Sequence, residues 1–232
     1  MPISNHLWQV DRDLLDSWAK KDFYQISGLH RESPGKAQME SHAAHSFETI
    51  KGLIKPQAVF SYFPEPSLEG GRLTLGNEWV YCQVLEQVDP ERIRGALVYG
   101  LTIGDYPDDE DLFIRLMGDF WGTAYVDSAR KSLREDMKAR EEFKEFFFSD
   151  ELGPGFFGMG MNNAWKFGKL IDLSEIGVQL GSKGMMTPQK SALGLYLISE
   201  DSPITFGDRC LYCKGNEGGC KLCMEEDFKG GI

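Results

Sequence analysis

The chain has 232 residues, of which 41% are apolar and 12% aromatic, and its formal net charge is -11. This composition is typical of a folded globular protein and excludes a disordered, solvating tail. Nucleic acid and anionic membranes are disfavoured as partners because they would be repelled by the net charge, and the densest basic stretch, residues 131–144, alternates basic with acidic side chains.

The first 35 residues mix polar and apolar positions and end in the turn signal Ser33-Pro34-Gly35. Residues 1–10 carry neither the basic nor the apolar region of a secretory signal, and no apolar run is long enough to cross a bilayer. We therefore expect a cytoplasmic protein in which thiols stay reduced.

The next segment predicts a helix followed by strands. Apolar side chains recur every three or four positions over residues 37–54, and Lys55-Pro56 ends this helical pattern. Strands are predicted over residues 57–63, around Leu73 and Leu75, and over residues 79–84 and 96–103, with a turn at Gly70-Gly71. The stretch between the last two strands is also compatible with a helix.

A long helix is predicted next, because Pro107-Asp108-Asp109-Glu110 is a typical helix start. Its first half is apolar on one broad face, and its charged second half continues to about Phe148. The glycine-rich residues 153–161 sustain neither a helix nor a central strand. The remaining predicted elements are a helix over residues 164–170 and strands over residues 177–180 and 192–198.

The C-terminal segment predicts a metal centre. Four of the five cysteines follow the spacing C-x2-C-x6-C-x2-C, at Cys210, Cys213, Cys220 and Cys223. Thiolates are soft ligands, so one shared ion is favoured over four reduced surface thiols. Zinc would make a closed structural site and an iron–sulfur cluster a redox site, and the spacing leaves both open. Cys82 is expected to be a small buried apolar residue.

A weaker metal candidate is the set His42, His45 and Glu48, spaced three residues apart on the first predicted helix. A solvated helix face is the favoured interpretation of this set, because a metal would need a further ligand. The sequence has no G-x-S-x-G, Walker, H-E-x-x-H or Rossmann motif.

Gly153-Pro154-Gly155-Phe156-Phe157 is a candidate ligand loop. Its glycines would let the backbone approach a flat ligand, and its aromatic rings could pack on an adenine or a corrin. A plain loop that connects two helices is an equally good interpretation.

Three segments carry a resemblance to a known family: Gly100–Ala129, Gly153–Phe156 and Leu180–Ser191. The second is similar to an R-P-A-P-G-Y loop and the third to an L-T-E-S-x-x-M-x-P-x-x-S element. With them the chain resembles a stand-alone version of the activation (reactivation) domain of vitamin B12-dependent methionine synthase, over roughly residues 30–225. Glu151 stands at the position of the arginine that opens the family's loop, and Phe156 at that of its tyrosine.

The resemblance implies a fold and a ligand site. The expected fold is α+β, a single C-shaped domain over residues 1–207 with a twisted antiparallel sheet flanked by helices, followed by the cysteine metal knuckle over residues 208–232. By analogy with the family, the loop binds S-adenosylmethionine together with side chains of the long helix. The implied ligand residues are Gly153, Pro154, Gly155, Phe156, Phe157, Thr123 and Asp127, and no catalytic residue is assigned.

The resemblance also implies an activity, which is the return of inactive cob(II)alamin to methylcobalamin on a corrinoid-carrying methyltransferase. The methyl group would come from S-adenosylmethionine and an electron from a flavodoxin-like or ferredoxin-like donor. If the cysteines hold an iron–sulfur cluster, that cluster could supply the electron itself. The alternatives are a non-catalytic module that binds a corrinoid protein and has a structural zinc knuckle, and an unrelated small-molecule binder on the same fold.

The cysteine spacing predicts bound metal in protein that is purified without oxygen. Elemental analysis should find either zinc in a colourless protein or iron with sulfide in a brown one. A colourless zinc protein would rule out electron delivery by the cysteine segment, and metal-free protein would contradict the metal centre altogether.

Overall fold

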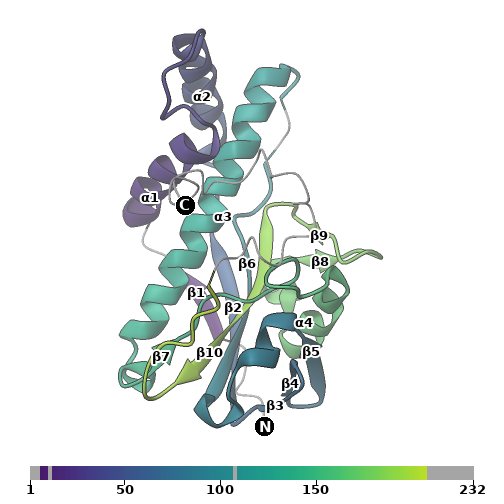
Figure 1. Ribbon diagram of the computed structural model, residues 1–232. Coiled ribbons are helices and arrows are strands. Elements are labelled where there is room, and N and C mark those ends of the chain that lie inside the picture. The colour runs from purple at the N-terminus through teal and green to yellow at the C-terminus, as the bar shows by residue number, and fades with distance from the viewer. Residues whose placement is uncertain (1–5, 10–11, 107–108, 208–232) are drawn as a thin grey trace.

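A five-stranded antiparallel sheet lies at the centre of the fold, in the order β1-β2-β6-β10-β7 (Figure 1). In this computed structural model, residues 6–9, 12–106 and 109–207 are described. The strands of the sheet are β1 (His6–Gln9), β2 (Gln57–Pro64), β6 (Gly95–Thr102), β7 (Phe147–Phe148) and β10 (Ser191–Ser199).

The middle of the sheet is covered on both faces. All eight residues of β6 are buried, and alternate residues belong to two different hydrophobic clusters. Leu97 and Tyr99 point to one cluster and Ala96 and Val98 to the other, as the period of two in a strand requires. This double burial explains why β6 reads as a continuous apolar run rather than as an alternating pattern.

Three helices cover one face of the sheet: α1 (Arg12–Ile26), α2 (Lys36–Ile50) and α3 (Leu112–Ala139). With 28 residues α3 is about 42 Å long, and both other helices pack against it (Figure 1). Its first turn is capped by Asp111, whose carboxylate accepts hydrogen bonds from the amides of Phe113 and Ile114. Trp121 stacks on Phe23 of α1, with ring centroids 3.8 Å apart, and donates a hydrogen bond to the carbonyl of Ala43 in α2.

Shorter elements cover the opposite face of the sheet (Figure 1). Side chains of α4 and of β4 and β5 belong to the hydrophobic cluster on that side. These shorter elements are α4 (Ala164–Leu170), a small sheet of β3 (Ser67–Glu69), β4 (Arg72–Leu75) and β5 (Glu78–Tyr81), and a hairpin of β8 (Gln179–Leu180) and β9 (Met186–Thr187).

The structure confirms the expected fold class, an antiparallel sheet flanked by helices. The helix predicted over residues 37–54 is α2, the helix over residues 164–170 is α4, and the predicted strands correspond to β2, β4, β5, β6, β8 and β10. The stretch between β5 and β6 forms two short 3-10 helices. Residues 208–232, the predicted metal knuckle, lie outside the described residues, so the division of the chain at residue 207 stays a prediction.

One helix was not predicted, and the end of another needs correction. The mixed pattern of the first 35 residues hides α1, in which the buried residues Leu15, Ala19 and Phe23 recur every fourth position. The long helix ends at Ala139 and not near Phe148, because Phe147 and Phe148 form β7 and pair with β10. Within the described part of the chain, no helix has the length and apolar character that a membrane span requires.

We predict that Phe23→Ala lowers the free energy of unfolding by about 3–5 kcal/mol, because it removes a buried ring that joins α1 to α3. Urea unfolding followed by tryptophan fluorescence measures this loss. The matched change Phe147→Ala, at a ring that is 41% exposed, should cost about 1 kcal/mol or less. Equal losses in the two variants would contradict the packing of α1 described above.

Candidate functional site

A cavity of about 580 Å³ lies between α1, α3 and the chain that follows β7. We call it the arginine cavity. Four acidic and three basic residues line it, and the others include Gln25, Phe157, Tyr196 and Gly207. The charged residues are Asp22, Asp127, Asp150 and Glu151 with Arg130, Lys131 and Arg134.

The periodicity of α3 brings three of these charges to one side of the helix. Asp127, Arg130 and Arg134 are spaced at i, i+3 and i+7, which places them on one face. Other positions of the helix are buried against α1. Tyr125 donates a hydrogen bond to Asp16 at 2.8 Å, and burial followed by the Asp16 carboxylate raises the pKa of this tyrosine.

An ion pair between Arg130 and Glu151 joins α3 to the loop after β7. Arg130 donates from Nε to Glu151 at 2.8 Å and forms a second bond to it from Nη2, while Nη1 donates to Asp127 at 2.9 Å. The hydroxyl of Tyr99 on β6 also donates to Glu151. The Arg130 and Glu151 side chains are only 13% and 17% exposed, so each buried charge has the partner that it needs.

Arg134 lies one turn further along α3. Its Nη2 donates to the backbone carbonyls of Phe148 at 3.2 Å and Ser149 at 3.0 Å, and its guanidinium carbon is 5.6 Å from the centre of the Tyr196 ring. Burial and the negative charge of Glu151 raise the pKa of Tyr196, so its phenol stays neutral. The wall of the cavity here combines a cation with a buried aromatic ring.

The predicted ligand loop lies beside this cavity, and its backbone is held from within. The amide of Gly155 donates to the carbonyl of Met159, and that of Phe156 to the carbonyl of Gly153. Phe157 is buried and lines the cavity with a backbone φ of +49°, which is uncommon for a residue other than glycine.

Close packing explains two further features of the loop. Gly153 packs so closely on β10 that a Cβ there would lie 2.6 Å from the carbonyl oxygen of Leu193, so this position requires glycine. The ring of Phe156 lies under the guanidinium of Arg130 at 5.2 Å. The loop therefore contributes Phe157 to the cavity wall, while Phe156 packs against Arg130 and the amides of Gly155 and Phe156 are bonded within the loop.

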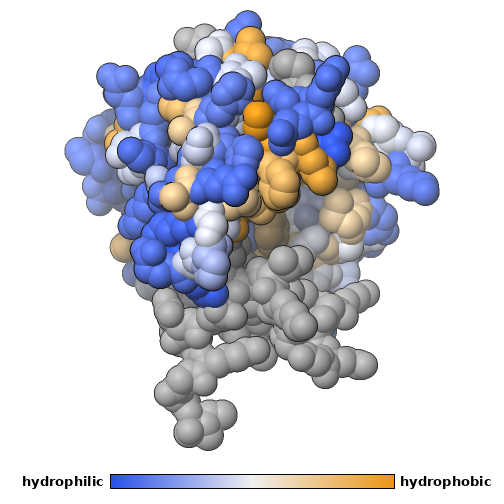
Figure 2. Space-filling model, turned by 90° about the horizontal axis from the view of Figure 1, so that it is seen from above, coloured by the Kyte–Doolittle hydropathy of each residue, from blue (hydrophilic) through white to orange (hydrophobic). Residues whose placement is uncertain are grey.

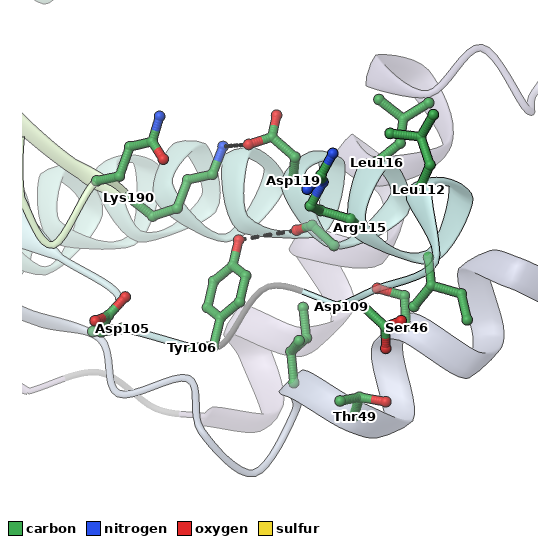
Figure 3. Close-up of a pocket in the computed structure, with 15 residues that line it drawn as sticks. Ser46, Thr49, Asp105, Tyr106, Asp109, Leu112, Arg115, Leu116, Asp119 and Lys190 are labelled. Atoms are coloured by element: carbon green, nitrogen blue, oxygen red, sulfur yellow. Dashed lines mark hydrogen bonds and ion pairs between the residues drawn. The ribbon is translucent and has the colours of Figure 1, made fainter.

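Lys190 and Asp119 line a second, smaller cavity of about 460 Å³, which we call the lysine cavity (Figure 3). There Lys190 pairs with Asp119 at 2.6 Å and donates to the hydroxyl of Thr123 at 3.0 Å. The hydroxyl of Tyr106 donates to the carbonyl of Gly118, and a Cβ at Gly122 would collide with that hydroxyl. The structure thus places Asp127 and Phe157 at the arginine cavity, whereas Thr123 bonds to Lys190, a residue of the lysine cavity.

The lysine cavity has an apolar rim. Leu112 and Leu116 line it and are 63% and 41% exposed, and the neighbouring Phe113 is 50% exposed. All three belong to the first turns of α3, at the upper end of the molecule in Figure 1. Seen from above, hydrophobic residues gather within a mainly hydrophilic surface (Figure 2).

The predicted metal ligands Cys210, Cys213, Cys220 and Cys223 lie outside the described residues. Among the residues that are described, no group of three or more His, Cys, Asp or Glu side chains is arranged to hold a metal ion. His42 stacks on Phe113, and the exposed Glu48 pairs with Lys51, in agreement with a solvated helix face. Cys82 is buried as expected, and burial raises the pKa of its thiol to about 11.

Comparison with known proteins identifies a similar fold. No family model and no curated protein matches the sequence. A solved structure of the MetH reactivation domain bound to AdoHcy has a similar fold, with a TM-score of 0.65 at 12% sequence identity, over 86% of this chain and 80% of that chain. This likeness confirms the fold that the sequence resemblance implied, and at this identity it establishes the fold alone.

Sequence reasoning missed Arg130, Arg134 and Tyr196 as site residues. The two arginines belong to the charged half of the long helix, which the alternation of signs marks as a solvated face. Tyr196 stands in an apolar run that identifies a strand and gives no sign of a cavity. The spacing of Asp127, Arg130 and Arg134 on one helix face was the available signal.

A double-mutant cycle with Arg130→Met and Glu151→Gln should give a coupling energy of about 1–3 kcal/mol, because either single change removes an ion-pair partner from a largely buried charge. Urea unfolding of the four proteins measures it. The exposed pair Lys138–Glu135 on the same helix is the control, with an expected coupling of about 0.3–0.5 kcal/mol. A coupling at Arg130–Glu151 no larger than in the control would mean that this pair does not hold the loop.

Proposed function

We propose that this protein reactivates a corrinoid-dependent methyltransferase and that it binds S-adenosylmethionine in the arginine cavity. The observation that carries the proposal is a cavity of about 580 Å³, walled by the long helix and the predicted ligand loop, in a fold similar to that of the MetH reactivation domain bound to AdoHcy. The volume is within the range of small-molecule sites in proteins.

The charges of the cavity suit this ligand class. S-adenosylmethionine has a sulfonium, an ammonium and a carboxylate, so it needs acidic and basic groups in one site. Asp127 uses only one carboxylate oxygen in its bond to Arg130, and Asp150 adds negative charge to the cavity wall. The buried rings of Phe157 and Tyr196 add apolar surface for the adenosine part.

In the proposed reaction, one electron reduces cob(II)alamin on the partner to cob(I)alamin. The cobalt then takes the methyl group as the carbon–sulfur bond of the sulfonium breaks, and S-adenosylhomocysteine is released. This chain would orient the sulfonium and exclude water, and the reaction needs no proton transfer from a side chain. The electron would come from a flavodoxin-like or ferredoxin-like donor or from an iron–sulfur cluster at the four cysteines.

The metal at the four cysteines would decide how the electron arrives. An iron–sulfur cluster at Cys210, Cys213, Cys220 and Cys223 would suit electron delivery, whereas zinc at the same ligands would favour the alternative, a non-catalytic binding module.

Calorimetry with S-adenosylmethionine and S-adenosylhomocysteine tests the ligand assignment. Both should bind, and Gln25→Trp should weaken binding at least about tenfold, because it places a large ring at the exposed edge of the cavity. The control Lys20→Trp, at an exposed position of α1 that does not line the cavity, should bind like the wild type. Absence of binding to the wild type would contradict the proposal.

The reactivation itself is tested with a corrinoid methyltransferase loaded with cob(II)alamin. With S-adenosylmethionine and a reductant present, this protein should speed the return of the methylcobalamin absorption spectrum, and Gln25→Trp should not. Ligand binding without any acceleration would leave the non-catalytic module as the function.

A further inference from the structure

We propose that Arg134 recognises the carboxylate of the amino-acid part of the ligand, a role that rests on the proposed binding of S-adenosylmethionine. The argument starts from the positive charges of the arginine cavity, which are Arg130, Lys131 and Arg134. An anionic group of a ligand will bind where a cation is not already neutralised by carboxylates of the protein.

Two of the three cations are neutralised. Arg130 is held by Glu151 and Asp127 in three hydrogen bonds. Lys131 donates to both carboxylate oxygens of Asp22 at 2.8 Å, and its side chain is 57% exposed. Neither Arg130 nor Lys131 can bind a ligand anion unless it gives up an ion pair within the protein.

Arg134 differs from both. No carboxylate of the described residues lies within ion-pair distance of it, and its bonds go to the neutral carbonyls of Phe148 and Ser149. Its Nε–H is buried and has no acceptor in the ranges that the structure describes. The full positive charge is thus held at the cavity wall by backbone groups that orient the guanidinium without neutralising it.

The surroundings of Arg134 select a zwitterion rather than a simple anion. Asp150 follows Ser149 in the chain and lines the same cavity, so an acid stands close to the carbonyl that Arg134 binds. A ligand with an ammonium and a carboxylate on one carbon would place the carboxylate at Arg134 and the ammonium towards the acids. This is the chemistry of an α-amino acid.

The two arginines of α3 therefore have different roles. Arg130 is a structural ion-pair partner that fixes Glu151, the residue at the position of the family's loop arginine. Arg134 provides the carboxylate contact from the helix instead. The fork of the guanidinium, with donors left after the two carbonyl bonds, is suited to a planar carboxylate.

The test uses S-adenosylmethionine and its decarboxylated form, which differ only in the carboxylate. By calorimetry the wild type should bind S-adenosylmethionine about 10- to 100-fold more tightly, as expected for a charged hydrogen bond. Arg134→Gln keeps donors for the carbonyls and removes the charge. This variant should bind S-adenosylmethionine about 10- to 100-fold more weakly than the wild type does. Its affinity for the decarboxylated ligand should stay within about threefold of the wild-type value.

The control is Lys138→Gln, one turn further along α3 at a cation that pairs with Glu135 and does not line the cavity. It should keep the wild-type ratio of the two affinities. If Arg134→Gln does not fold, the ratio is measured on Arg134→Lys, which keeps a point charge and loses the fork, and it should fall several-fold.

The outcomes separate this inference from the proposed function. If the wild type binds neither ligand, the proposed function fails and this role fails with it. If the wild type binds both ligands equally, or if the Arg134 variants keep the wild-type ratio, S-adenosylmethionine binding stands and the role of Arg134 is wrong.

Discussion

The ion pair between Arg130 and Glu151 is the interaction on which the geometry of the arginine cavity depends. Its partners come from three elements, since Tyr99 of β6 bonds to the same carboxylate as Arg130 of α3. Two largely buried charges are tolerated only when each has several well-placed partners, and Asp127 completes the set for the arginine. The helix, the central strand and the loop are therefore fixed relative to one another by one charged cluster.

The long helix α3 also ties this cluster to the core. Tyr125 and Ser128 donate hydrogen bonds to Asp16 and Asp22 of α1, while Arg130 and Arg134 line the cavity. Successive helical residues are about 100° apart around the axis, so a shift of α3 by one residue would break the contacts on both sides together. The position of α3 therefore sets both the packing of α1 and the shape of the cavity. For this reason α1, which the mixed sequence pattern did not reveal, matters to the site.

The fold was largely predictable because its signals are local. The buried runs of β6 and β10 and the glycines and proline of residues 153–155 identify strands and a loop from neighbouring residues alone. The charged cluster was not predictable in the same way. Glu151 pairs with Arg130, which lies 21 positions earlier in the sequence. Acidic and basic residues that alternate along a helix give the same sequence pattern whether their side chains face water or a cavity. Only the packing of α3 against the sheet decides which of its charges are buried.

The proposed role of Arg134 would place the positive charge for a ligand on the long helix instead of on the loop. An acid at position 151 would repel a ligand carboxylate if it stood alone, but here it is neutralised by an arginine one element away. Under the proposed role of Arg134, the loop keeps its glycine turn and its aromatic rings while α3 supplies the positive charge for the ligand. A similar fold at 12% identity, with a TM-score of 0.65, is possible because hydrophobic patterning and packed volume specify a fold, and many different sequences satisfy them.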